Sequence, residues 1–274
     1  MGAKNLVIFD YSGTLSLESV LFAEPKRLEE ELRRSGLHDL GVTTPDVFWN
    51  EIVDFTWERG STTGIGYKRL LAERLVDLRK AFSNPAPKEV ISAAAGRFVD
   101  RYLEASRIHD AWHSLLRRMA GNPDAVAVVA TDHYAEATDA VIRHLQAAGV
   151  KAGTARNAFP AGEASSLVAN SADLGALKTD RRFWETVRAF PFLSEIGQLL
   201  LIDDFGYNEQ ARDSYGAGRK VEKRQEKTTA LLREIFRIPV EVLPFLLDDP
   251  QRKEEGFANL VRRTAPRIEA LCRL

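Results

Sequence analysis

The sequence predicts an α/β protein with a parallel sheet, helices on both faces of that sheet, and a large helical insertion. Three observations indicate this. Short apolar runs alternate with amphipathic helical patterns. The stretch between the first two runs holds helical patterns and no convincing strand. Polar residues follow the apolar runs where the strands should end.

Five apolar runs are the expected strands. In chain order they are NLVIFD (5–10), AVAVVAT (125–131), GVKAGT (149–154, the weakest), QLLLIDD (198–204) and PVEVLPF (239–245). The runs at 5–10, 125–131 and 198–204 lack the polar alternation of a half-exposed strand. Both faces of these strands should therefore be covered, as in a parallel sheet.

Helical patterns separate these strands. They are AEATDAVIRHLQAAG (135–149), DRRFWETVRAF (180–190) and EKTTALLREIF (226–236). Strands that alternate with such helices predict a doubly wound, Rossmann-like core.

The insertion follows the first strand. Its helical patterns are EPKRLEEELRRSG (24–36), PDVFWNEIVDFTWERG (45–60), GYKRLLAERLVDLRKAF (66–82) and PKEVISAAAGRFVDRYLEAS (87–106). A crossover between parallel strands needs only about a dozen residues. We therefore expect a core of residues 1–15 and 108–274 and an all-helical cap of residues 16–107.

Composition excludes several classes of protein. The chain has 274 residues, a formal net charge of −1 and 45% hydrophobic residues, so a broad nucleic-acid footprint is not expected. No apolar run approaches the roughly 20 residues of a membrane helix, and the N-terminus does not resemble a signal peptide. The single cysteine, Cys272, excludes an internal disulfide. A cytoplasmic protein, monomeric or homodimeric, is the expectation.

The expected strand ends collect polar side chains at one edge of the sheet. These are Asp10, Ser12, Thr14, Thr131, Asp203, Asp204 and Asn208, with Lys178 just before a helix start. Clustered carboxylates without histidine or cysteine favour a hard cation such as Mg²⁺. A site of this kind can hold a phosphate group while one aspartate acts as nucleophile. Lys178 would offset negative charge, Thr131 would hold phosphate oxygens, and Gly13 would allow the sharp turn.

These residues resemble a known family. DYSGTL, AVVAT ending at Thr131, Lys178, and LLLIDDFGYN are similar to the four motifs of the haloacid dehalogenase-like (HAD) superfamily, many members of which carry a helical cap after the first motif. The resemblance implies that Asp10 forms an aspartyl-phosphate. It also implies that the carbonyl of Ser12 and carboxylates of Asp10 and of Asp204 or Asp203 bind magnesium. Asn208 takes the place of a supporting polar residue.

One position departs from the family pattern. Hydrolytic members usually carry a second aspartate, the general acid and base, two residues after the nucleophile, where this chain has Ser12. Loss of such a group costs about a hundredfold to ten-thousandfold in rate. Asp132 and His133 are candidates to replace it. Dehalogenase members carry tyrosine there, whereas Tyr11 is one position early and should point away from the site.

The cap offers further candidates. The joint ERGSTTGIGYK (58–68) is either a substrate-selecting loop, with Arg59 as the residue to test, or an ordinary connection between helices. The aromatic residues Phe48, Trp49, Phe55 and Trp57 are expected in the cap core rather than in a binding site.

The expected function is that of a magnesium-dependent phosphatase for a small phosphorylated metabolite. The catalytic residues would be Asp10, Lys178 and Thr131, the substrate or phosphate contacts Ser12, Gly13, Thr131, Asp132 and Arg59, and the metal ligands Asp10, Ser12, Asp203 and Asp204. Two alternatives stay open. A phosphonate hydrolase would need a cap lysine for a Schiff base, for which Lys68 and Lys80 are the candidates, with Lys26 and Lys88 near the cap edges. A phosphate-binding or scaffold protein would have lost proton transfer at Ser12.

Overall fold

The computed structural model describes residues 3–81, 86–155, 166–210, 218–247 and 253–274. Its sheet has six strands in the order β3-β4-β2-β1-β5-β6, and every neighbouring pair is parallel. The strands are β1 (Lys4–Phe9), β2 (Ala125–Thr131), β3 (Ala152–Thr154), β4 (Ser166–Asn170), β5 (Ile196–Asp203) and β6 (Val240–Pro244). The parallel α/β, Rossmann-like fold expected from the sequence is confirmed.

Strand β4 is the one strand that the sequence pattern did not reveal. It is only five residues long and wholly buried, and it pairs with β2 and β3. Its sequence, SLVAN, is too short an apolar run to stand out without knowledge of the neighbouring strands. The other strands fall within two residues of their expected starts, except for β3, which is shorter than expected.

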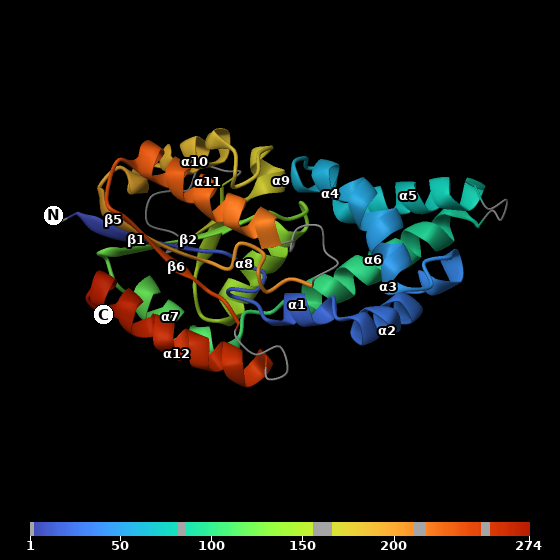
Figure 1. Ribbon diagram of the computed structural model, residues 1–274, viewed down its shortest axis with the longest axis horizontal. Coiled ribbons are helices and arrows are strands. Elements are labelled where there is room, and N and C mark those ends of the chain that lie inside the picture. The colour runs from blue at the N-terminus through green and yellow to red at the C-terminus, as the bar shows by residue number, and fades with distance from the viewer. Residues whose placement is uncertain (1–2, 82–85, 156–165, 211–217, 248–252) are drawn as a thin grey trace.

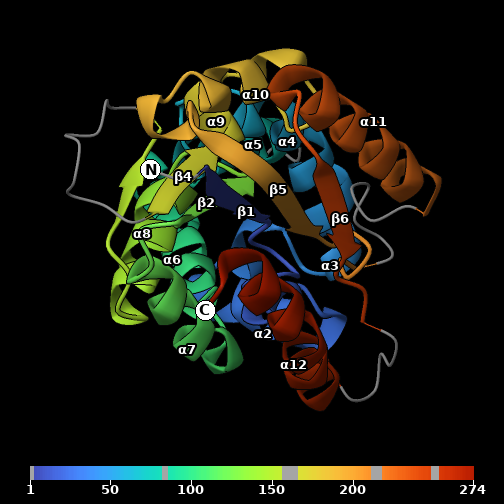
Figure 2. The same ribbon diagram turned by 90° about the vertical axis from the view of Figure 1, so that its left-hand side faces the viewer.

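Helices cover both faces of the sheet. The helices after residue 107 are α7 (Asp110–Ala120), α8 (Ala137–Ala147), α9 (Ser171–Leu174), α10 (Arg181–Arg188), the 3₁₀ turn η3 (Pro191–Leu193), α11 (Gly218–Phe236) and α12 (Lys253–Cys272). Figure 2 shows α7 and α12 on one side of the strands and α10 and α11 on the other. Strand β1 contributes side chains to both faces of the sheet, because successive side chains of a strand point to opposite faces. Val7 packs in the apolar cluster of one face and Leu6 in that of the other.

In the described part of residues 18–105, all regular secondary structure of the inserted segment is helical. It comprises α1 (Glu18–Phe22), α2 (Pro25–Ser35), η1 (His38–Leu40), α3 (Pro45–Val47), the π-helical η2 (Phe48–Val53), α4 (Asp54–Ser61), α5 (Tyr67–Ala81) and α6 (Lys88–Ala105). These helices lie at the end of the molecule away from both termini (Figure 1) and surround an apolar cluster of their own. Their bounds fall within the expected cap of residues 16–107.

Two further observations complete the fold. No helix in the described parts of the chain is both long and apolar enough to cross a membrane.

Cys272 is fully buried near the end of α12, and burial raises the pKa of its thiol to about 11. This thiol is therefore protonated at neutral pH and acts as an apolar core residue.

Candidate active site

A tight turn after β1 brings Asp10 to the edge of the sheet. Gly13 in this turn has a φ of +72°, and a Cβ atom there would lie 2.6 Å from Oδ2 of Asp204. Only glycine fits both the backbone conformation and this close approach. Asn208 secures the turn, because its Nδ2 donates to the carbonyl oxygens of Gly13 and Phe245, both at 2.8 Å.

A buried ammonium group joins two of the aspartates. Nζ of Lys178 donates to Oδ1 of Asp10 at 2.7 Å and to Oδ2 of Asp203 at 2.8 Å. All three residues are buried. The backbone of Lys178 is held as well, since its N–H donates to Oδ1 of Asp132 at 2.8 Å and its carbonyl accepts from the indole of Trp184 at 2.6 Å. The motif lysine therefore lies at the strand ends, where the sequence placed it.

Asp203 and Asp204 have different surroundings. Asp203 accepts from Lys178 with one oxygen and from the N–H of Phe205, at 2.6 Å, with the other. The two carboxylate oxygens of Asp204 accept backbone N–H groups of its own loop, from Gly206 at 3.1 Å and from Asn208 at 2.9 Å. Of the two, Asp204 lines the pocket in front of Asp10. Asp204 is thus placed to share a cation with Asp10, and Asp203 to orient Lys178.

The three carboxylates form a compact acidic group. Oxygen atoms of Asp10, Asp203 and Asp204 lie within 4.8 Å of one another. Burial raises the pKa of Asp10 to about 7; the charge of Lys178 opposes this rise and that of Asp203 adds to it. Burial, followed by the negative charges of Asp10, Glu209 and Asp203, raises the pKa of Asp204 well above its usual range. Carboxylates in this arrangement hold protons unless a cation balances them. Since all donors are oxygens, the group fits Mg²⁺.

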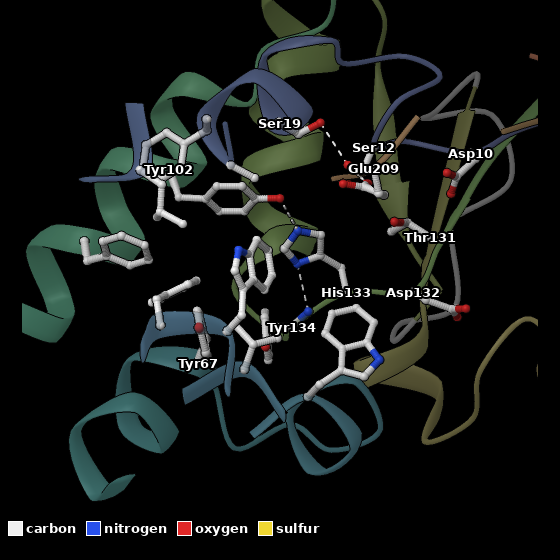
Figure 3. Close-up of a pocket in the computed structure, with 18 of the residues that line it drawn as sticks. Asp10, Ser12, Ser19, Tyr67, Tyr102, Thr131, Asp132, His133, Tyr134 and Glu209 are labelled. Atoms are coloured by element: carbon white, nitrogen blue, oxygen red, sulfur yellow. Dashed lines mark hydrogen bonds between the residues drawn. The ribbon is translucent and has the colours of Figure 1, made fainter. Parts of the chain in front are cut away.

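Thr131 and Asp132 extend the same site. Thr131 is the last residue of β2 and is buried. Both residues line the pocket with Asp10 and Ser12. Figure 3 shows Asp10, Thr131 and Asp132 at one side of this pocket. Strand ends from different parts of the sequence are thereby brought together at one edge, as expected.

The residue that sequence analysis missed is Glu209. The hydroxyl of Ser12 donates to Oε1 of Glu209 at 2.6 Å, and Ser12 Oγ also lies 2.9 Å from Oγ of Ser19 (Figure 3). Glu209 lines the pocket and stands one residue after Asn208 in the last motif. Its position directly after Asn208 was the signal in the sequence that could have identified it. A carboxylate therefore lies beside the position where the second aspartate is missing.

His133 lines the pocket as a neutral ring. Burial lowers its pKa to about 4. Its Nδ1 accepts the N–H of Tyr134 at 2.8 Å, so the proton of the neutral ring lies on Nε2, 2.9 Å from the hydroxyl of Tyr102. A histidine with these partners is a poor proton donor at neutral pH.

Two expectations for side chains near the site are resolved by their contacts. Arg59 is not among the described lining residues: its side chain is 57% exposed and pairs with Glu73 at 3.4 Å. The geometry therefore does not bring Arg59 to the site. Tyr11 points away from the pocket, as expected. Its hydroxyl donates to the carbonyl of Ser106 in the buried interior.

The cap lysines do not enter the described pocket either. Nζ of Lys68 pairs with Asp100 at 2.5 Å, and Lys26 and Lys88 are exposed. The side chain of Lys80 lies outside the described residues. No lysine occurs among the described residues that line the pocket.

The pocket joins the acidic group to an aromatic wall. Its cavity volume is about 120 Å³, and besides the polar residues above it is lined by Phe22, Ala23, Leu28, Phe48, Trp49, Val53, Trp57, Tyr67, Phe98, Tyr102 and Tyr134. Phe48, Trp49 and Trp57 belong to the apolar cluster of the cap, as expected, and they also line this pocket. The expectation of a position in the cap core was wrong for Phe55, which is 63% exposed. Periodicity located the helices but not the cavity that they face.

Comparison with solved structures finds similar folds at low identity. A magnesium-bound structure of YfnB from Bacillus subtilis, assigned to the HAD-hydrolases, is 13% identical with a TM-score of 0.44, over 79% of this chain and 86% of that one. The L-2-haloacid dehalogenase PA0810 is 16% identical with a TM-score of 0.44, over 78% and 81%. A 2-haloacid dehalogenase from Pseudomonas syringae pv. Tomato DC3000 is 19% identical with a TM-score of 0.46, over 79% and 84%.

No protein-family model and no curated protein matches the sequence.

Proposed function

We propose that this protein is a magnesium-dependent phosphatase of the haloacid dehalogenase-like type, acting on a small phosphorylated metabolite. The observation that carries the proposal is the buried contact of Lys178 with Asp10 and Asp203, beside Asp204. A nucleophile held by an ammonium group and facing a pocket suits attack on an anionic phosphoryl group.

The chemistry proceeds in two steps. The carboxylate oxygen of Asp10 not bound by Lys178 forms a bond to phosphorus while the bond to the ester oxygen breaks, and the leaving alkoxide takes a proton from Glu209. Water then attacks phosphorus and returns a proton to Glu209, the bond to Asp10 breaks, and phosphate leaves. Lys178 offsets charge on the phosphoryl group, and the hydroxyl of Thr131 holds one of its oxygens.

A metal site fits in front of the nucleophile. The carboxylates of Asp10 and Asp204 and the carbonyl of Ser12 would hold Mg²⁺, with Asp203 as a further carboxylate within reach. The ion supplies charge that balances both the carboxylates and the phosphoryl oxygens.

Proton transfer is assigned to Glu209. Ser19 Oγ donates to the carbonyl of Ser16 at 2.9 Å, so it can accept a hydrogen bond from Ser12. When Glu209 is ionised, the hydroxyl of Ser12 donates to it. When Glu209 is protonated, it can donate to Ser12, which then donates to Ser19. Both protonation states are accommodated, as a general acid and base requires.

The contacts of the other candidates support this choice. His133 is neutral and engaged on both ring nitrogens. Asp132 accepts the backbone N–H of Lys178 with Oδ1, so it supports the lysine rather than the leaving group.

The alternatives are weakened by specific contacts. A phosphonate hydrolase would need a lysine in the pocket, and the described lining holds none. A dehalogenase would need a tyrosine facing Asp10, whereas Tyr11 contacts Ser106. A phosphate-binding protein without turnover remains the second candidate, since Ser12 cannot itself act as an acid near neutral pH.

The wider setting follows from the same proposal. Helices α1–α6 would act as the cap of a core formed by residues 1–15 and 108–274, covering the strand ends during the reaction. The protein would work in the cytoplasm, because a single buried cysteine suits a reducing compartment. It would act as a monomer or a homodimer.

Phosphate release tests the proposal directly. We would measure it over a panel of phosphate monoesters, with Mg²⁺ or with EDTA, for the native protein and for Asp10→Asn. Turnover that needs Mg²⁺ and is lost in Asp10→Asn is expected, together with a phosphoryl adduct detected by intact mass. Magnesium-dependent phosphate binding without release or adduct would instead identify a binding protein.

A further inference from the structure

The wall of the pocket beyond the acidic group is built mainly from rings, with Ala23, Leu28 and Val53 among them. Rings that touch one another run across it: His133 stacks on Tyr102 at 5.5 Å between centroids, Tyr102 meets Phe22 at 5.3 Å, Phe22 meets Phe98 at 5.7 Å and Phe98 meets Phe48 at 5.0 Å. All five residues line the cavity. A continuous surface of this kind favours contact with hydrocarbon.

A second set of rings closes the other side. Tyr134 stacks on Tyr67 at 3.8 Å with nearly parallel planes and meets Trp57 edge-on at 5.4 Å. In Figure 3 the labelled residues Tyr67, Tyr102 and Tyr134 lie on the side of the pocket away from Asp10. The end that receives the phosphoryl group is therefore polar, and the far end is aromatic.

The charged residues of the described lining also favour an uncharged substrate group. The described lining includes Asp10, Asp132, Asp204 and Glu209 but no lysine or arginine. A second phosphate or a carboxylate on the substrate would find no cation there. The hydroxyls of a sugar would lose water without gaining enough partners along this wall, which is costly.

The cavity volume indicates the size of the substrate group that the rings would contact. It is about 120 Å³, and an apolar protein cavity of about 150 Å³ binds benzene. A single ring or a branched chain is of this size.

We infer that the preferred substrates are phosphate monoesters of a compact, uncharged hydrocarbon group, such as a benzyl or a branched alkyl group. The inference rests on the proposed function for the reacting end of the substrate. It concerns the other end, which the aromatic wall contacts.

Matched esters provide the test of selectivity. Benzyl phosphate is compared with ribose 5-phosphate, and 3,3-dimethylbutyl phosphate with phosphocholine, which has the same shape but a quaternary ammonium. We expect kcat/KM to be about tenfold or more higher for the hydrocarbon member of each pair. Preference for ribose 5-phosphate would overturn the inference. So would preference for phosphocholine, because it would identify the rings as a cation cage.

Variants connect the preference to the wall. Trp49→Ala removes a lining ring of η2, and Phe55→Ala, the control, removes an exposed ring at the start of the adjoining helix α4. Trp49→Ala should lower kcat/KM for benzyl phosphate about tenfold or more, while inhibition by inorganic phosphate stays unchanged. An equal effect of both variants would contradict the assignment of this wall.

Binding separates this inference from the proposed function. The affinities of benzylphosphonate and methylphosphonate are measured calorimetrically with Mg²⁺. If no ester is hydrolysed but benzylphosphonate binds more tightly, the phosphatase proposal fails, whereas the preference of the aromatic wall for a hydrocarbon group stands. If esters are hydrolysed but the two phosphonates bind equally, the inference fails and the function stands.

Discussion

The hydroxyl of Ser12 and the carboxylate of Glu209, 197 positions apart in the chain, lie 2.6 Å from each other in the lining of the candidate active site. The contact places an acid where the first motif has none. Glu209→Gln should therefore lower kcat about a hundredfold or more, because the leaving alkoxide loses its proton donor. Steady-state phosphate release at fixed Mg²⁺ measures the change.

The matched control is Glu234→Gln, which alters an exposed glutamate paired with Arg181 on the surface. Its kcat should equal that of the native protein. Ser12→Ala should cost less than Glu209→Gln, since it removes only the group that orients the acid. If Glu209→Gln kept the kcat of the native protein, Glu209 would not be the proton donor, and Asp132 would be the next candidate.

The sequence located the acidic group for a simple physical reason. Asp10, Thr131 and Asp203 each end a parallel strand or follow it directly, and such ends meet at one edge of a sheet. Glu209 lies in a loop, whose path no strand or helix pattern determines. Arg59 was placed in the site because its segment was polar and rich in glycine, but its side chain pairs with Glu73 at the surface instead. Periodicity could not show this, because it does not fix how the inserted helices face the sheet.

Lys178 should be a large contributor to stability when no metal is bound. Lys178→Met leaves Asp10 and Asp203 buried without their shared cation. Breaking a buried pair in this way costs about 3–5 kcal/mol. Urea unfolding in EDTA measures the loss.

The double variant Lys178→Met, Asp203→Asn serves as the comparison. It also removes the charge of Asp203, which in Lys178→Met is a buried carboxylate without its cation. Its free energy of unfolding should therefore be higher than that of Lys178→Met alone. Mg²⁺ should restore part of the loss in the single variant. Equal stability of the native and single-variant proteins in EDTA would contradict a structural role for this ammonium group.

The acidic group should also give the metal-free protein an unusual pH dependence. Burial raises the pKa of Asp10 from 3.8 to about 7, so between these values the folded protein binds a proton that the unfolded chain has lost. The contribution of Asp10 to the free energy of unfolding therefore falls as the pH rises from about 4 to about 7, by a few kcal/mol in total.

His133 acts in the opposite direction, because its pKa is lowered to about 4 and its contribution is lost as the pH falls below about 6.5. Asp10→Asn isolates the aspartate. Urea unfolding in EDTA gives the free energy of unfolding of both proteins. The value for the native protein minus the value for Asp10→Asn should decrease as the pH rises from about 4 to about 7. Mg²⁺ should flatten this difference; a difference independent of pH in EDTA would mean that Asp10 titrates normally.

The turn at Gly13 should tolerate no side chain. Gly13→Ala places a Cβ atom 2.6 Å from Oδ2 of Asp204 and 3.2 Å from Cβ of Asn208, at a φ of +72°. Gly41→Ala is the matched control, because its φ is +99° and no atom lies within 4 Å of the added Cβ. The control should lose about 1–2 kcal/mol from the backbone conformation alone.

Gly13→Ala should lose more than the control, and it should also weaken magnesium binding, because Asp204 must move. Thermal unfolding with and without Mg²⁺ separates the two effects. The native protein and Gly41→Ala should gain the same stabilisation from Mg²⁺, and Gly13→Ala should gain less. If Gly13→Ala were stabilised by Mg²⁺ as strongly as the control, Asp204 would not be a ligand, and the metal would have to be held by Asp10 with other groups.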